Sequence, residues 1–328
     1  MAKSKQTMGK VAFRGKIFGL SKAKDNIVDN EKQRKLSFII KTDNDNAHYV
    51  TVNQWKGSMK KAYLFKNVDD GENEQKVTEW ENRYKFVDDG FEPIGVKTKA
   101  KNSEDTMSLY EYDFIDFLIE NFEDGDSVFF RGKATFSEGD KKVYHNFEPT
   151  HFYPTSEDID FNEEDFKETS DFNLSLVFKD ASVIDDKVFV NGYIFDWKEV
   201  PILEKFIVED TEPDLQKYLM KEAGYGDVFP VEGVVHNRVT YKEKESEKPE
   251  GSGLGKKRGS FDNSYTNREI DSERKELQLV YSEMPLQGVY SKKDIEAFKN
   301  QEKKEGKSSK SENFDAKKDK PTGMPWDK

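Results

Sequence analysis

Two short segments of the chain carry almost the same pattern of glycines and strand-forming residues. The first reads GDSVFFRG at 125–132, and the second reads GDVFPVEG at 226–233. Each follows a stretch that predicts a helix, one with apolar residues at helical spacing over 112–122 and one at 213–223. A helix, a glycine turn and a strand that recur in this order predict two similar folding units.

The residues around these segments alternate between apolar and polar, which is typical of half-buried antiparallel strands. We align KVAFRGKIF at 10–18 with KVFVNGYIF at 187–195 as the first strands of the two units. Residues 36–42 and 48–54 predict one hairpin, and 127–136 and 142–152 predict another. A helix before the fourth strand of a small antiparallel barrel is the arrangement of the OB-fold. We therefore predict a mainly β fold with short α-helices, in which two OB-fold domains each form a five-stranded Greek-key barrel.

Shifts in composition predict the domain boundaries. The first OB-fold domain spans 8–155 and contains a β-rich insertion at 56–107, and an acidic linker follows at 156–171. The second OB-fold domain spans 172–288 and contains a basic loop at 242–273. Residues 289–328 are lysine-rich with few aliphatic side chains, so we predict a disordered C-terminal tail.

The pattern of helix, glycine, strand and glycine at 125–132 and 226–233 resembles the segment before strand four in bacterial single-stranded DNA-binding proteins. The resemblance covers short motifs in both halves, and the chain looks like a phage- or bacterial-type member with two OB domains in place of one. It departs from that family in its insertion, in the compact interval 192–233 and in its tail. It implies non-catalytic, largely sequence-independent binding of single-stranded DNA in phage DNA replication, recombination or repair.

Such binding needs aromatic side chains that stack on bases and cations that follow the phosphates. In the first domain the candidate DNA-binding residues are Arg14, Lys16, Phe18, Lys22, Lys24, Arg34, Lys35, Tyr49, Trp55, Lys56, Phe129, Arg131, Lys133 and Tyr144. In the second domain they are Lys256, Lys257, Arg258, Phe261 and Tyr265, all in the basic loop. Two alternatives stay open: the outward aromatic residues pack under the insertion, and the lysine-rich loops are simply solvated.

The end of the chain resembles, in position, the terminus by which bacterial single-stranded DNA-binding proteins recruit replication and repair enzymes. Met324, Pro325 and Trp326 are the candidate partner-binding residues, and the implied partners are replication or recombination proteins. The tail departs from the family because it ends in Lys328 and carries eleven Lys against eight Asp/Glu from Ser291. Contact of the tail with DNA or with a phage partner is the alternative.

The formal net charge is -12, but it is unevenly distributed. Residues 1–35 carry ten Lys/Arg against three Asp/Glu, whereas 101–170 carry six against nineteen. This predicts a local basic face for an anionic partner, and the total argues against tight, indiscriminate binding of duplex DNA.

The sequence offers little for catalysis. It has no cysteine, which excludes a disulfide scaffold and a thiolate zinc site, and only four histidines. HExxH, GxSxG and a phosphate-binding loop with lysine and serine do not occur. We therefore expect no enzyme, no cofactor and no metal.

The start of the sequence has no apolar stretch behind its lysines, and no apolar run approaches 18 residues. We expect no signal peptide, no membrane span and a cytoplasmic location, which is the bacterial host cytoplasm if a phage encodes the protein. Two other functions stay open: an OB-fold module for protein interaction or assembly, and a replisome accessory factor whose catalytic partner lies on another chain.

Overall fold

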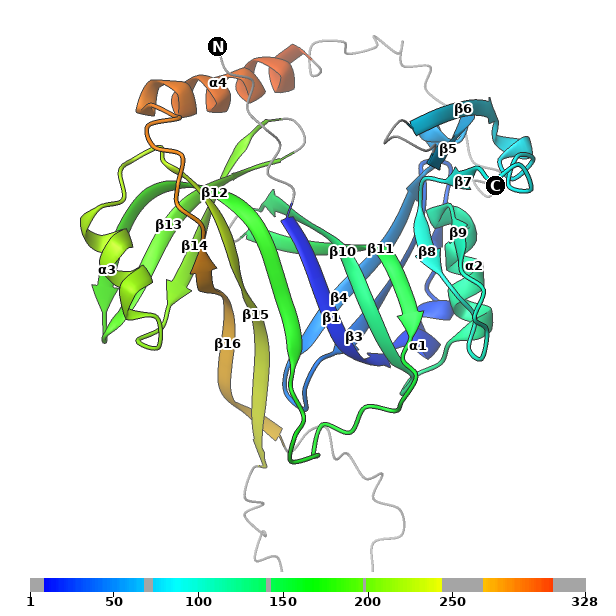
Figure 1. Ribbon diagram of the computed structural model, residues 1–328, viewed down its shortest axis with the longest axis horizontal. Coiled ribbons are helices and arrows are strands. Elements are labelled where there is room, and N and C mark those ends of the chain that lie inside the picture. Colours follow the sequence, from blue (N-terminus) through cyan, green and yellow to red (C-terminus); the bar gives the residue numbers. More distant parts are fainter. Residues whose placement is uncertain (1–8, 68–72, 140–142, 197–198, 244–267, 309–328) are drawn as a thin grey trace, which may run out of the picture.

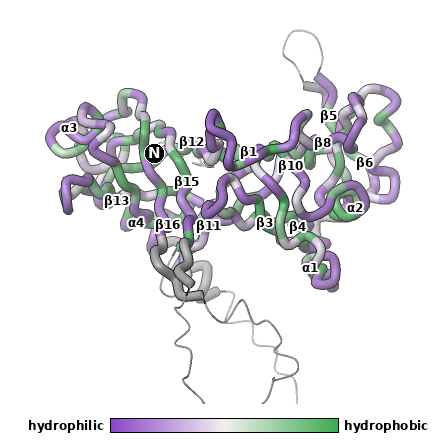
Figure 2. Tube along the Cα trace, turned by 90° about the horizontal axis from the view of Figure 1, so that it is seen from below, coloured by the Kyte–Doolittle hydropathy of each residue, from purple (hydrophilic) through white to green (hydrophobic). Residues whose placement is uncertain are grey.

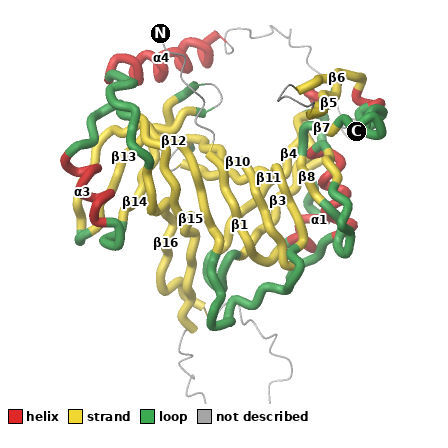
Figure 3. The backbone as a smooth tube through the Cα atoms, viewed as in Figure 1, coloured by secondary structure: helices red, strands yellow, loops and turns green. Residues whose placement is uncertain are grey.

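The computed structural model describes residues 9–67, 73–139, 143–196, 199–243 and 268–308. Two β-barrels lie side by side, and the helices lie at their periphery (Figures 1 and 3). Along the strands hydrophobic residues alternate with hydrophilic ones, as the sequence pattern predicts (Figure 2). In the described part of the chain no helix has the length and apolar character needed to cross a membrane.

The first barrel has the strand order of an OB-fold. Its strands are β1 (Gly9–Phe18), β3 (Gln33–Lys41), β4 (Ala47–Trp55), β10 (Ser127–Glu138) and β11 (Val143–Pro154). β1 pairs with β3 and β10, β3 pairs with β4, and β10 pairs with β11, all antiparallel. A parallel pairing of β4 and β11 closes the barrel, and the helix α2 (Glu111–Asn121) precedes the fourth strand.

The second barrel repeats this arrangement. Its elements are β12 (Thr169–Ile184), β13 (Lys187–Phe195), β14 (Pro201–Val208), α3 (Pro213–Lys221), β15 (Val228–Glu243) and β16 (Arg268–Ser282). The pairings are again antiparallel except for the closing pair, β14 and β16, which is parallel. The predicted fold class of two OB-fold barrels is therefore confirmed, although β14 was not among the predicted strands.

The repeated segments 125–132 and 226–233 are equivalent in the structure. Gly125 and Gly226 have positive φ angles of 95° and 86°, and each precedes the fourth strand of its barrel. Gly132 and Gly233 each lie at a β-bulge, where an added Cβ would lie 2.3 Å from the carbonyl oxygen of Glu148 or 2.0 Å from that of Gln278. Glycine at these positions thus has the same steric cause in both barrels.

The alignment of 10–18 with 187–195 is wrong. Residues 10–18 belong to β1, the first strand of its barrel, whereas 187–195 form β13, the second strand of the other barrel. The counterpart of β1 is β12, which bends at a bulge between Phe178 and Asp180 and has no glycine at this point. In β1 the bend falls at Gly15, whose Cβ would lie 1.9 Å from the carbonyl oxygen of Lys41. The first strand of one barrel has a glycine here and that of the other has a β-bulge. The two strands therefore do not align by sequence.

The two barrels share one sheet because β1 and β12 pair antiparallel, with Lys10 opposite Asn173 and Arg14 opposite Thr169. Side chains at the long hairpins add contacts between the barrels. His145 of β11 lies 2.9 Å from Glu204 of β14, and Arg238 of β15 pairs with Asp43, Asp45 and Glu168.

The segment predicted as an acidic linker is docked on the first barrel. Ile159 is buried, and the Asp158 carboxylate accepts hydrogen bonds from Ser127 and Lys16. β12 begins at Thr169, inside the predicted linker range.

The insertion forms a small sheet beside α2. Its strands are β5 (Lys61–Asn67), β6 (Asn73–Glu79) and β7 (Glu92–Pro93), with 3-10 turns at Lys56–Ser58 and Trp80–Asn82. The later strands β8 (Val96–Thr98) and β9 (Met107–Leu109) join the large sheet instead, because β8 pairs with β11. Trp80 packs on Tyr110 and Tyr112 next to α2. The segment between β1 and β3 contains α1 (Leu20–Lys24) and β2 (Val28–Asp29).

The segment 289–328 differs from the prediction of a wholly disordered tail. Residues Lys292–Ser308 form the helix α4, whose Ile295 side chain is only 2% exposed. Ser291 and Asp294 cap its first turn through reciprocal side-chain and backbone hydrogen bonds of 2.7–3.3 Å. Met324, Pro325 and Trp326 lie outside the described residues.

His48 occupies the junction between the two barrels. It is 1% exposed and stacks on Phe13 with ring centroids 4.3 Å apart. Its Nε2 lies 3.2 Å from the Thr42 hydroxyl and 2.9 Å from the Ser170 hydroxyl. Burial, with a smaller effect of the nearby His236 and Arg238, lowers the pKa of His48 to about 3, so the ring is neutral near pH 7.

This burial predicts a loss of stability in mild acid. Below about pH 6.5 His48 binds a proton in the unfolded chain but stays neutral in the folded chain. The free energy of unfolding therefore falls by up to about 1.4 kcal/mol per pH unit as the pH decreases toward the pKa of His48 in the folded state. Urea unfolding of the wild type and His48→Gln between pH 6.5 and 5 measures this slope. We expect the variant to be less stable at pH 7 but to have a shallower slope, and equal slopes would contradict the assignment.

Candidate nucleic-acid interface

An aromatic row crosses the outer face of the first barrel at β1, β3 and β4. Phe18 is opposite Ile39, and Ile39 is opposite Tyr49, so the three side chains are direct cross-strand neighbours. Phe18 is 36% exposed and Tyr49 is 64% exposed. Trp55 lies six residues beyond Tyr49 on the same face of β4 and is 58% exposed. We call this surface, with Lys35 and Lys41 of β3, the β3–β4 face.

The β3–β4 face is hollowed beside α1. A depression of about 280 Å³ is lined by Phe18, Lys22, Asn26, Ser37, Ile39 and Tyr49, among others. The Lys41 ammonium lies 4.8 Å from the centre of the Phe18 ring. Among the described residues Lys22, Lys35 and Lys41 take part in no ion pair, so their charges are available to an anion.

The spacing of the aromatic residues fits a chain of stacked bases. Six residues of a strand separate Tyr49 from Trp55, which corresponds to about 20 Å. Both side chains are exposed, and the described part of the insertion does not bury them. The alternative that these outward aromatic residues pack under the insertion therefore does not apply to Tyr49 and Trp55.

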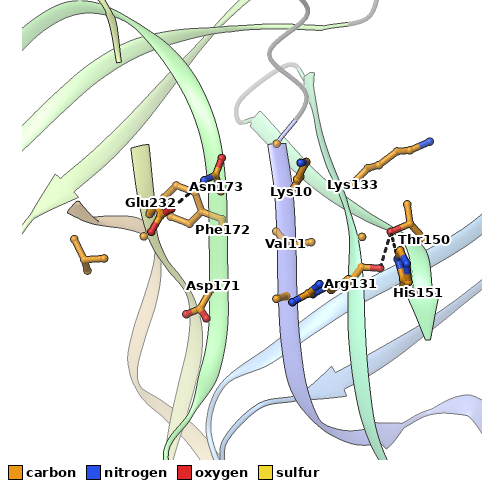
Figure 4. A pocket seen from close by; sticks show the side chains of 15 residues that line it. Lys10, Val11, Arg131, Lys133, Thr150, His151, Asp171, Phe172, Asn173 and Glu232 are labelled. Carbon is orange, nitrogen blue, oxygen red and sulfur yellow. Dashed lines mark hydrogen bonds between the residues drawn. The ribbon is translucent and has the colours of Figure 1, made fainter. Parts of the chain in front are cut away.

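A second group of predicted residues lies elsewhere, in a groove between the barrels. The groove has a volume of about 770 Å³ (Figure 4). Lys10, Arg131 and Lys133 line it from the first barrel, and Asp171, Asn173 and Glu232 line it from the second. The two walls therefore carry opposite charges. We call this cavity the inter-barrel groove.

Burial and neighbouring charges shift two groups of the inter-barrel groove. The pKa of His151 is lowered by burial and by the cations Arg131 and Lys97. The pKa of Asp171 is raised by burial and by the carboxylates Glu168 and Glu232. On each wall, burial and like charges thus favour the neutral form of the titrating group.

Two other predicted residues lie beside the groove on β1 and β10, and a third lies on the β10–β11 hairpin. Arg14 is opposite Phe129 in the register of β1 and β10, and the Arg131 guanidinium lies 5.4 Å from the centre of the Phe129 ring. Tyr144, which is half exposed, lies near the end of the β10–β11 hairpin. The predicted site residues therefore divide between two surfaces.

Three predicted cations are engaged in contacts within the protein. Arg34 is 8% exposed, donates to both Asp116 carboxylate oxygens at 2.8 and 2.5 Å, and donates to the Tyr112 carbonyl oxygen at 2.9 Å. The hydrogen bonds to Asp116 raise the pKa of Arg34. Lys16 pairs with Asp158 and Lys56 pairs with Asp29. Arg34 is therefore a structural residue that ties β3 to α2, and we leave it out of the interface.

The remaining predictions have simpler outcomes. Lys22 and Lys24 lie on α1, and Lys35 lies on β3. Lys256, Lys257, Arg258, Phe261 and Tyr265 lie outside the described residues. Sequence reasoning missed Ile39 and Lys41, although the alternation of β3 from Lys35 onward would have placed both on the outer face. In the described ranges no three His, Asp or Glu side chains gather in a way that would hold a metal ion.

Fold and surface together define a protein with two OB-fold barrels, one of which presents an open aromatic and basic face. The sequence matches the YorF family over residues 10–313, and the chain belongs to this family. No curated protein matches it.

Among solved structures, the chain is similar to the single-stranded DNA binding protein from Thermus aquaticus, in its wild-type form and in a deletion mutant. Each comparison has 10% sequence identity and a TM-score of 0.39, and covers 88% of this chain and 97% or 98% of the other. The OB-fold assignment rests on the strand pairings and not on this similarity.

The structural role of Arg34 is testable. Arg34→Ala leaves the Tyr112 carbonyl and both Asp116 carboxylate oxygens without the Arg34 donor, and we expect the free energy of unfolding to fall by about 2 kcal/mol. Lys35→Ala, one residue along on the outer face, is the matched control and should cost less than about 0.5 kcal/mol. Chemical denaturation measures both, and equal effects would show that Arg34 is not the tie between β3 and α2.

Proposed function

We propose that this protein binds single-stranded DNA, without catalysis and largely without sequence preference, through the β3–β4 face of its first barrel. The observation that carries the proposal is the open row of Phe18, Ile39 and Tyr49 beside the unpaired Lys22, Lys35 and Lys41. Every base has a face that stacks on an aromatic ring, and every phosphate attracts a lysine, so such a surface accepts any sequence.

The shape of the β3–β4 face favours a single strand over a duplex. Stacking on Tyr49 and Trp55 requires unpaired bases, because the faces of bases inside a duplex are already covered. The net charge of -12 repels a duplex from most of the protein surface, so attraction is confined to the few unpaired lysines. In this arrangement Tyr49 and Trp55 hold bases on β4, while Lys35, opposite Asn53, lies between them and Lys41, opposite Ala47, lies beyond Tyr49.

We place this binding in DNA replication, recombination or repair, in a phage and so in the cytoplasm of its bacterial host. The support for this setting is the resemblance of 125–132 and 226–233 to bacterial single-stranded DNA-binding proteins. The proposed contacts to replication or recombination proteins use Met324, Pro325 and Trp326, by the same resemblance.

The inter-barrel groove favours a second candidate function, a protein-interaction or replisome accessory role. Its walls carry opposite charges, with Lys10, Arg131 and Lys133 against Asp171 and Glu232. A polyanion would meet repulsion from one wall, whereas a peptide with charges of both signs would match both. A gel shift with single- and double-stranded DNA separates the candidates, because the second predicts no shift with either.

Substitutions at the β3–β4 face test the proposed function directly. Removal of one stacking partner costs about 1–3 kcal/mol, so Tyr49→Ala and Trp55→Ala should each weaken binding of oligothymidine by about 5- to 150-fold. Fluorescence anisotropy of a labelled oligonucleotide at moderate salt measures this. Tyr63→Ala, an exposed aromatic residue of the insertion, is the control and should leave affinity unchanged. If the wild type binds no oligothymidine at low salt, the proposed function is wrong.

The salt dependence of binding tests which cations touch the phosphates. Each lost phosphate contact lowers the slope of log affinity against log salt by about 0.7 for a single strand. We expect this decrease for Lys35→Ala and for Lys41→Ala, and no change for Lys133→Ala in the inter-barrel groove. The reverse result would move the site from the β3–β4 face to the groove.

A further inference from the structure

The second barrel has an aromatic strip on the outer side of its second strand. Phe189, Tyr193 and Phe195 all point to the outer side of β13. Six residues separate Phe189 from Phe195, the same spacing that separates Tyr49 from Trp55 on the first barrel. The Lys205 ammonium of β14 lies 4.0 Å from the centre of the Phe189 ring. We call Phe189, Tyr193 and Phe195 the β13 strip.

Most of the β13 strip is covered by the chain's own helix α4 and by Tyr290 just before it, whose ring stacks on Phe195 with centroids 5.3 Å apart. Phe195 and Tyr193 are buried in a cluster with Val177 and Ile295 that is separate from the main core. The ring of Phe298 lies 5.4 Å from that of Phe195, and the Lys299 ammonium lies 4.8 Å from the centre of the Tyr193 ring. Figure 1 shows α4 lying across the end of the second barrel. Phe189 is not part of the covered cluster.

On the first barrel, no described helix covers the position that corresponds to Tyr193. The loop at Gly125 bonds to Ile17, and the loop at Gly226 bonds to Phe178, so these two residues are equivalent. By the strand registers Tyr193 then corresponds to Lys41. In both barrels the segment after the fifth strand passes close to this position. In the first barrel that segment contacts Lys16 through Asp158, and it leaves Phe18 and Lys41 accessible.

Few side chains of α4 are buried against the second barrel. Of residues 292–300 only Ile295 is buried and only Phe298 is half-buried, while the others are exposed. The strap that precedes the helix is held separately, because Tyr290 donates to the Gly226 carbonyl at 3.1 Å and Gly288 donates to Asp227 at 2.7 Å. Two apolar side chains therefore attach residues 292–300, together with Lys292 and Lys299 over the rings of Tyr225 and Tyr193. The Tyr290 ring of the strap stacks on Phe195 at 5.3 Å, so detachment of the helix alone uncovers Tyr193 and leaves Phe195 in contact with the strap.

We propose that α4 is a displaceable cover, and that the β13 strip beneath it is a second surface for the bases of single-stranded nucleic acid. This inference rests on the proposed function of the first barrel. Like the β3–β4 face, the strip carries aromatic rings on one strand with a lysine beside them, because the Lys205 ammonium of β14 lies over the Phe189 ring. The second surface opens only when a strand competes with Ile295 and Phe298, so the first barrel binds first.

The test uses the full-length protein and counts bound oligonucleotides. Ile295→Ser with Phe298→Ser removes both apolar attachments, and Ala297→Ser with Asn300→Ser is the matched control on exposed positions of α4. Native mass spectrometry with oligothymidine of about eight nucleotides gives the stoichiometry. We expect one oligonucleotide on the wild type and the control, and two on the released variant. Tyr193→Ala in the released variant should return the count to one.

The outcomes separate the two proposals. No binding by the wild type contradicts the proposed function, whereas one oligonucleotide on both the wild type and a folded released variant overturns this inference alone and makes α4 a permanent structural cap. If the released variant does not fold, hydrogen exchange of the wild type decides. Saturating long poly-dT should then speed exchange of the amides at 292–300, and unchanged exchange would overturn the inference.

Discussion

The antiparallel pairing of β1 with β12 is the constraint on which the rest of the structure depends. It joins the first strands of two closed barrels into one sheet, so neither strand leaves this edge open to another chain. Side-chain contacts across the junction then fix the angle between the barrels. Arg238 pairs with Asp43, Asp45 and Glu168, and Asn46 donates to the Val235 carbonyl at 3.1 Å. The inter-barrel groove exists because this junction holds the two walls at a fixed separation.

The two barrels share a topology but not a surface. On the first barrel the outer aromatic row at Tyr49 is open, and the chain that leaves the fifth strand is held away from it by polar contacts such as Asp158 with Lys16. On the second barrel the corresponding chain continues into α4, whose Ile295 lies over Tyr193. A duplicated fold thus allows one surface to be exposed while its counterpart is covered, without a change in either barrel core.

Local patterns were sufficient to predict the fold class but not every element. The glycines at 125, 132, 226 and 233 have steric causes that act over a few residues, so they marked the fourth strand of each barrel correctly. The first strand of the second barrel was misassigned because β12 bends at a bulge and not at a glycine. The helix α4 was missed because composition outweighed a local signal: Ser291 and Asp294 form a cap, and Ile295 and Phe298 follow at helical spacing.

The site was less predictable than the fold. Whether a cation is free to bind DNA depends on ion pairs with residues far away in the sequence. Residue type alone does not distinguish Arg34 from Lys35, yet Arg34 is paired with Asp116, which lies 82 positions away in the sequence. Lys16 is likewise paired with Asp158, at a separation of 142 positions. An acidic protein pairs many of its cations in this way, and those left unpaired at the surface determine where an anion is attracted. On the β3–β4 face the lysines without an ion pair lie beside exposed rings, and this coincidence, not the total charge, favours a single strand at that surface.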